Sequence, residues 1–225
     1  MMKILLLSAV GALSAAVSIP VANASVLAVI GQESDVDQVT ATAAGGVTTI
    51  SSSALVDITA IDAPISVPVT ATLNFTASSV GSAVSVGGNV VQAFSGSFSI
   101  TGSGNNYLSG TFTDSVFGGG TSLVLSASSD QPGETVTFTS SVIPVVDLAD
   151  NRGISFSFTD VSPPATTVGS GASRTLAPFA ADISGDFSAT PVVPEPATWA
   201  MLGLGFAGMG LLGLTRRRKG PRYAL

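Results

Sequence analysis

The sequence predicts an all-β fold, an antiparallel β-sandwich or jelly-roll-like domain. Short runs in the central part of the chain alternate apolar residues with Ser or Thr, and clusters of Gly, Pro and Asp separate these runs. That part shows no sustained helical pattern and no lasting repeat, which argues against a β-solenoid. The patterns described below predict five parts: a signal peptide (1–24), an all-β extracellular domain (25–189), a Pro-rich linker (190–196), a transmembrane helix (197–215) and a basic cytoplasmic tail (216–225).

The N-terminal 24 residues have the three parts of a secretory signal peptide. Lys3 supplies the positive charge, and residues 4–17 form the apolar run. Ala22 and Ala24 complete an A-x-A cleavage site, so the mature chain is predicted to begin at Ser25. A retained N-terminal membrane helix is the alternative, but the apolar run is short for a membrane span.

Strands are expected in order along the central part of the chain. Residues 25–31 form the first, a polar acidic stretch follows over 32–42, and two weak strands are separated by serines at 47–51 and 55–61. Period-two alternation is then clear in 67–75, 84–86, 94–100, 108–112, 123–127, 136–138, 154–158 and 183–187. Turns are predicted at 87–89, 102–106 and 130–133, a strand end at Pro163, and at most one turn of helix over 144–150.

Charge and composition exclude several classes of function for this central part. Between Ser25 and Val193 only Arg152 and Arg174 are basic, against thirteen acidic residues, so the net charge is −11. Such a surface repels nucleic acid and anionic membranes. The chain has no Cys, hence no disulfide framework, and no His, which excludes Ser-His-Asp and Cys-His catalysis and the usual zinc sites.

The composition of the C-terminal segment predicts a membrane anchor. Residues 197–215 carry no charge, and nineteen residues at about 1.5 Å rise span roughly 28 Å, close to the thickness of a bilayer core. Trp199 stands at the outer end, where an indole prefers the interface. A basic cluster follows directly and should stay cytoplasmic: Arg216, Arg217, Arg218 and Lys219.

The residues just before this helix carry a family resemblance. Pro194, Glu195 and Pro196, followed by Trp199 and Ala200, resemble the PEP-CTERM sorting signal in its PEPxxWA form. The resemblance implies recognition by an exosortase, a membrane transpeptidase-like enzyme of Gram-negative bacteria. It further implies removal of the helix and basic tail, and delivery of the remainder to the cell surface or exopolysaccharide matrix. A Pro-rich linker before an ordinary tail anchor is the alternative.

Acidic residues supply the candidate sites. Clusters of carboxylates can bind calcium, which takes six to eight oxygen ligands, and two carboxyls in a cleft can form a glycosidase pair. We expect ordinary solvated acids instead, because the calcium-loop pattern is missing from the sequence. The candidates are Asp35 and Asp37, Asp147 and Asp150 beside Asn151, and Asp182 and Asp186, which are expected to flank the last strand.

One loop offers a further contact candidate. Tyr107 follows Asn105 and Asn106 in a Gly/Asn-rich turn. A sugar site usually presents an aromatic platform, so these three residues are a possible contact loop. We expect Tyr107 to be an exposed turn residue, and the phenylalanines, which sit at alternating inward positions, to form the core.

The sequence thus predicts a non-enzymatic exported protein without a resident cofactor. Its partners would be an exosortase, the inner membrane through the helix before processing, and exopolysaccharide, but not nucleic acid. It would reside transiently in the inner membrane and then at the surface or in the extracellular matrix. The alternatives are a secreted carbohydrate-active enzyme that uses paired carboxylates and a plain C-terminally anchored membrane protein.

Overall fold

The computed structural model describes residues 24–34, 36 and 39–190, and it confirms an all-β, antiparallel fold. Two short 3-10 helices, η1 (Val145–Leu148) and η2 (Gly171–Ser173), interrupt the strands. The strands are β1 (Ser25–Gln32), β2 (Val39–Ala44), β3 (Val47–Ile61), β4 (Val69–Ser79), β5 (Val84–Val86), β6 (Asn89–Gly102), β7 (Asn105–Gly119), β8 (Ser122–Ser128), β9 (Thr135–Thr139), β10 (Asp150–Ser162), β11 (Thr167–Val168), β12 (Thr175–Leu176) and β13 (Phe179–Thr190).

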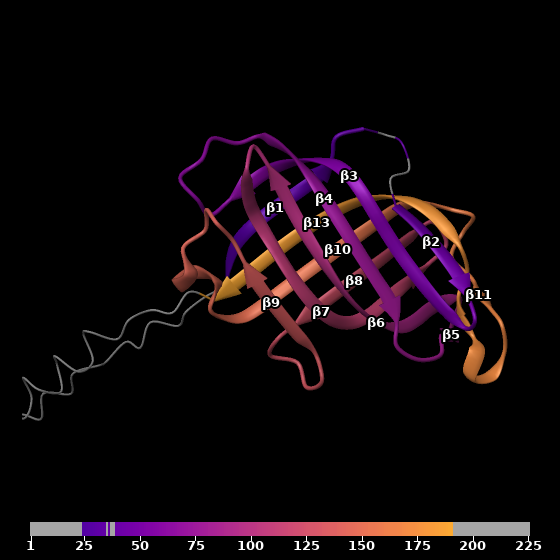
Figure 1. Ribbon diagram of the computed structural model, residues 1–225. Coiled ribbons are helices and arrows are strands. Elements are labelled where there is room, and N and C mark those ends of the chain that lie inside the picture. Colours follow the sequence, from indigo (N-terminus) through magenta and orange to yellow (C-terminus); the bar gives the residue numbers. More distant parts are fainter. Residues whose placement is uncertain (1–23, 35, 37–38, 191–225) are drawn as a thin grey trace, which may run out of the picture.

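Eight of the strands form a closed meander. The pairing runs β1–β3–β4–β6–β7–β8–β10–β13, and β13 pairs again with β1. β2 adds to β3 and β13, while β9 adds to β7. In Figure 1 the near strands β3, β4, β6 and β7 cross the far strands β8, β10 and β13, which gives a two-layered, sandwich-like body.

The jelly-roll connectivity that we predicted is wrong. A jelly roll is built from Greek keys, whereas here each strand of the ring pairs with its neighbours in sequence. Inward and outward residues alternate in the same way in both topologies, so the alternation could not distinguish them. The two weak strands predicted over 47–51 and 55–61 are one continuous strand, β3.

β1 and β2 share one position in the ring, and Gln32 bridges the break between them. Gly31 of β1 pairs with Ser184 of β13, and Val39 of β2 pairs with Ala181 of β13. Asp182 and Ile183, between these positions, have ladder partners on β10 but none on this side. The Gln32 side chain fills this gap, since its Oε1 accepts from the Ile183 N–H at 3.0 Å. Glu33, Ser34 and Val36, the described residues between β1 and β2, can therefore stand outside the strands without opening the ring.

Phenylalanine rings fill the interior, as the alternation predicted. Phe75 and Phe156 lie 4.8 Å apart between ring centroids, Phe156 and Phe187 5.4 Å, and Phe98 and Phe187 4.9 Å. These rings come from both layers and are fully or almost fully buried. Edge-to-face and tilted pairs at such distances add about 0.5–1.5 kcal/mol each beyond the area they bury.

Glycines at inward positions make room for these rings. A Cβ on Gly110 would lie 2.0 Å from the Thr137 carbonyl oxygen and 3.1 Å from the Phe98 ring. A Cβ on Gly96 would lie 2.3 Å from the Thr76 oxygen. The neighbouring backbone and rings can approach this closely only because no side chain stands at either position.

Replacing Gly110 by Ala should therefore lower the free energy of unfolding by about 1–3 kcal/mol, since the added methyl meets backbone that must shift. Urea denaturation of the purified protein measures this. Gly31→Ala is the matched control, because a Cβ there has nothing within 4 Å. Equal stability of the two variants would contradict the packing role of Gly110.

A buried polar network closes one end of the ring. The Gln92 side chain donates from Nε2 to the Gly81 carbonyl at 2.7 Å, and its Oε1 accepts from the Leu176 N–H at 2.9 Å. The hydroxyls of Thr48 and Thr175 lie 2.6 Å apart, with Thr175 also 3.0 Å from Gln92 Nε2. The three side chains are almost fully buried and tie β3, β6 and β12 together.

Gln92→Leu should lower the free energy of unfolding by about 1–3 kcal/mol, because the buried Leu176 N–H and the part-buried Gly81 carbonyl lose their Gln92 partner. Thermal and urea unfolding measure the loss. The control Gln131→Leu changes an exposed turn residue and should stay within about 0.5 kcal/mol of wild type. A similar loss in both variants would show that the network does not stabilise the fold.

Candidate functional site

Hydroxyl side chains gather on the outward side of six adjacent strands, whereas further along β3 the outward positions include Leu55 and Asp57. We call this surface the hydroxyl face. It occupies the exposed side of β2, β3, β4, β6, β7 and β9, and none of its members is charged. Its residues are Thr40, Thr42, Thr49, Ser51, Ser53, Asn74, Thr76, Ser78, Ser95, Ser97, Ser99, Ser109, Thr111, Thr113, Thr135, Thr137 and Thr139.

Strand register arranges the hydroxyl face in rows. One row runs across all six strands through successive Cα partners, namely Thr40, Ser51, Thr76, Ser97, Thr111 and Thr137. The rows on either side hold the residues two positions away on each strand. Neighbours are thus about 4.8 Å apart along a row and about 6.8 Å apart along a strand.

Hydrogen bonds between neighbouring strands orient many of these hydroxyls. Thr111 and Thr137 lie 2.7 Å apart between their Oγ1 atoms, and Thr113 and Thr135 lie 3.3 Å apart. The Thr111 and Thr135 N–H groups also donate to the facing threonine side chains. A threonine hydroxyl has one donor and two acceptor positions, so each keeps capacity for a further partner.

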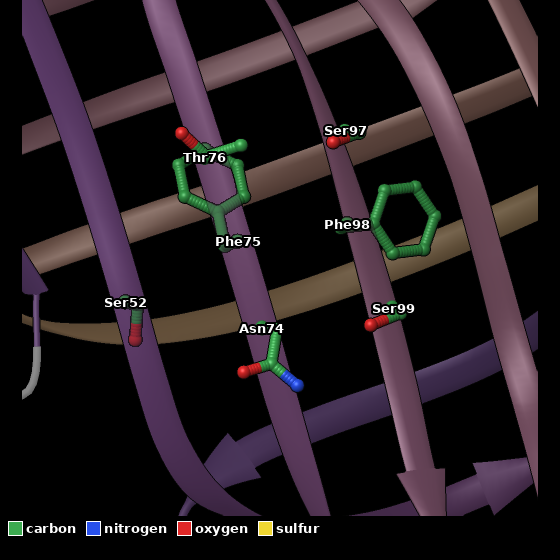
Figure 2. A pocket seen from close by; sticks show the side chains of 7 residues that line it. All are labelled: Ser52, Asn74, Phe75, Thr76, Ser97, Phe98 and Ser99. Atoms are coloured by element: carbon green, nitrogen blue, oxygen red, sulfur yellow. The ribbon is translucent and has the colours of Figure 1, made fainter.

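A shallow hollow of about 220 Å³ lies within the hydroxyl face. It is open to solvent, and Figure 2 shows the residues around it on three neighbouring strands. Asn74 and Thr76 line it from β4, and Ser97 and Ser99 from β6; the other lining residues are Ser52, Phe75 and Phe98.

Ser52 differs from the other serines around the hollow. Strand alternation puts it on the same side of β3 as the buried Ile50 and Ala54. Its Oγ is buried and has no hydrogen-bond partner among the described residues. A desolvated hydroxyl without a partner costs stability and supplies no binding group to the outer face.

Ser52→Ala should leave the free energy of unfolding unchanged or raise it by up to about 1 kcal/mol, since it removes an unsatisfied group. Urea denaturation measures the effect. Ser140→Ala is the contrasting control, because Ser140 Oγ accepts from the Ile143 N–H at 2.9 Å and donates to the Tyr107 carbonyl at 2.6 Å. A clear loss on Ser52→Ala would mean that its hydroxyl is satisfied.

The acidic candidates do not form a common site among the residues that the structure describes. We expected Asp182 and Asp186 to flank the last strand. They lie instead within β13, on its outward side. The 3.3 Å rise of a strand puts their Cα atoms about 13 Å apart. Asp182 Oδ1 accepts from Gln32 Nε2 at 2.8 Å, so it helps to hold the bridge between β1 and β2.

The other acids give no ligand set in the described part of the chain. Asp147 lies in η1, and Asn151 follows at the start of β10 with φ 49°. Asp35, Asp37 and the side chain of Asp150 lie outside the described residues. No group of three or more acidic side chains that could hold a metal ion occurs among those described, and calcium binding stays a prediction.

The expectation of an exposed Tyr107 is wrong, and so is the proposed contact loop. Tyr107 is 4% exposed and lies in β7. The register shifts here, because Ile100 faces Leu108 while Thr101 faces Asn106. This bulge lets the consecutive residues Tyr107 and Leu108 both enter the core, which strict alternation does not anticipate.

The predicted sorting residues lie outside the described residues. This holds for Pro194, Glu195, Pro196, Trp199 and Ala200, for Arg216, Arg217, Arg218 and Lys219, and for Ala22. Ala24 directly precedes β1, whose first residue is Ser25. Over residues 24–34, 36 and 39–190, no helix is long and apolar enough to cross a membrane.

Comparison of the chain with protein-family models, with curated proteins and with solved structures yields no match. Its function must therefore be inferred from its own residues.

The hydroxyl face was not singled out from the sequence. The signal was present in the serines and threonines that alternate with apolar residues in the strands from 47 to 139. Such alternation by itself indicates only a solvated outer side. The rows appear when the register brings these residues side by side across six strands.

Proposed function

We propose that this protein is an exported, non-enzymatic component of a bacterial surface or extracellular matrix, sorted by an exosortase through its C-terminal segment. One observation carries the proposal. Pro194–Pro196, the uncharged residues 197–215 and the basic cluster 216–219 occur in the order that the PEP-CTERM signal requires. The signal peptide over residues 1–24 supports export independently.

The described body supports a structural role. Its last strand ends at Thr190, so the sorting motif follows the sheet directly in sequence. The fold relies on a closed ring of strands and a phenylalanine core instead of disulfides, and the chain has no cysteine. A net charge of −11 between residues 25 and 193 disfavours nucleic acid as a partner. Association with exopolysaccharide belongs to the same proposal.

The rival enzyme hypothesis requires a pair of carboxyls about 5 to 10 Å apart in a cleft. Asp182 and Asp186 are too widely separated along β13 for this, and Asp182 is engaged with Gln32. The second rival hypothesis is a plain C-terminally anchored membrane protein. It predicts the same motif, helix and basic cluster as sorting does, but no cleavage of the C-terminal segment. Only an experiment on processing separates it from sorting.

The test compares wild type with the triple variant Pro194→Ala/Glu195→Ala/Pro196→Ala, expressed in a bacterium that has an exosortase. Intact mass is measured on protein from the membrane, surface and matrix fractions. Wild type should lack both terminal segments and leave the membrane, whereas the variant should keep its C-terminal helix and stay there. Pro191→Ala, which changes a proline outside the motif, is the control and should behave as wild type.

If wild type and the triple variant both keep the helix and sediment with membranes, sorting is wrong and residues 197–215 are simply an anchor. If Pro191→Ala blocks processing as strongly as the triple variant, the recognition element is not Pro194–Pro196.

A further inference from the structure

We propose that the hydroxyl face binds a neutral polysaccharide chain laid along its rows. This inference deepens the proposed function, because it names the surface and the class of polymer through which the exported body would attach to a matrix. It rests on the described residues and not on the sorting signal.

The charge distribution selects a neutral partner. Residues 25–193 carry a net charge of −11, yet none of the residues that define the hydroxyl face is charged, and Asp57 lies four positions beyond Ser53 on the outward side of β3. An anionic polymer would be repelled by the whole body, and a cationic one would find carboxylates only at the border of this face, at Asp57 and Glu134. An uncharged polyhydroxylated polymer matches a surface made of uncharged donors and acceptors.

The geometry selects a polymer over a small sugar. Each exposed hydrogen bond to a ligand replaces one to water and contributes little by itself. None of the residues that define the hydroxyl face is aromatic, so among them no ring is present on which one sugar could stack. Rows that cross six strands instead allow many weak contacts to act together along one chain, and their effects multiply once the first contact has formed.

The twist of the sheet selects a flexible chain over a rigid crystal plane such as ice. Neighbouring strands rotate by about 20 to 25° relative to each other, so the rows turn as they cross the sheet. A rigid lattice loses register over several strands, whereas a polymer chain can follow the turn. The interstrand hydroxyl pairs, such as Thr111 with Thr137, keep the surface ordered without blocking it.

The hollow marks the centre of the proposed contact. It lies between Asn74, Thr76, Ser97 and Ser99, of which Thr76 and Ser97 belong to the row described above. Thr76 is exposed and stands both in that row and at the hollow. A carboxylate placed there would have to lose its hydration for the polymer to approach, which is costly.

The test measures co-sedimentation of the purified full-length chain, in a detergent without a sugar headgroup, with an insoluble neutral glucan (curdlan). Binding to soluble dextran and to anionic alginate is measured by affinity electrophoresis. Wild type should bind the neutral glucans and not alginate. Thr40→Glu/Thr76→Glu, which puts two charges into one row, should weaken glucan binding about tenfold or more.

The matched control is Ser126→Glu/Ser184→Glu. Both residues are exposed on strands of the other layer, and the change in net charge is the same. This variant should bind as wild type does. Circular dichroism and the unfolding midpoint verify that both double variants are folded.

The proposal is overturned if wild type binds no neutral glucan, if both double variants lose binding equally, or if the protein restrains the growth of ice crystals but does not bind glucan. No exosortase takes part in this measurement. Its failure would therefore leave the sorting proposal standing, and failure of sorting would leave this result unchanged.

Discussion

The pairing of the first strand with the last is the constraint on which the structure depends. β1 and β13 are joined over residues that span nearly the whole described chain, from the Ser25 pair with Ala189 to the Gly31 pair with Ser184. This contact turns a meander into a ring in which each of the eight strands has a neighbour on both sides. A chain without cysteine obtains in this way the long-range closure that disulfides supply in many exported domains. Closure also protects the edges that an open sheet would present for aggregation.

Closure and core packing constrain each other. A ring of eight strands encloses space for side chains, and the phenylalanines from both layers occupy it. The phenylalanine side chains fit only where the facing residues are small. This is why Gly96 and Gly110 stand on the inward side of β6 and β7. The ends of the ring are sealed differently. At one end, Gln92 and its threonine partners form hydrogen bonds. Elsewhere, in the segment that leads into β10, the apolar side chains of Ile143 and Leu148 are buried.

A filled interior directs any partner to the outside of the molecule. The two layers differ there, because β13 presents Asp182 and Asp186, whereas the residues of the hydroxyl face are only Ser, Thr and Asn, with Asp57 further along β3. The same register that builds the ring aligns the hydroxyls in rows, so stability and a candidate binding surface come from one arrangement of strands. A sorted matrix protein with such a surface would need no pocket, since many weak contacts along a polymer can replace a single deep one.

The sequence by itself determined the all-β class, most strand positions and the phenylalanine core, and it allowed at most one turn of helix near Val145, because alternation and turn residues are local properties. It also carries the terminal segments from which export and sorting are proposed. Only the tertiary structure decided the closed meander, the burial of Tyr107, the place of Asp182 within β13 and the rows of the hydroxyl face. Each of these depends on which strands pair and in which register. Register is set by contacts between residues far apart in the chain. Period-two alternation shows which residues of a strand share a face, but it does not show which strands pair.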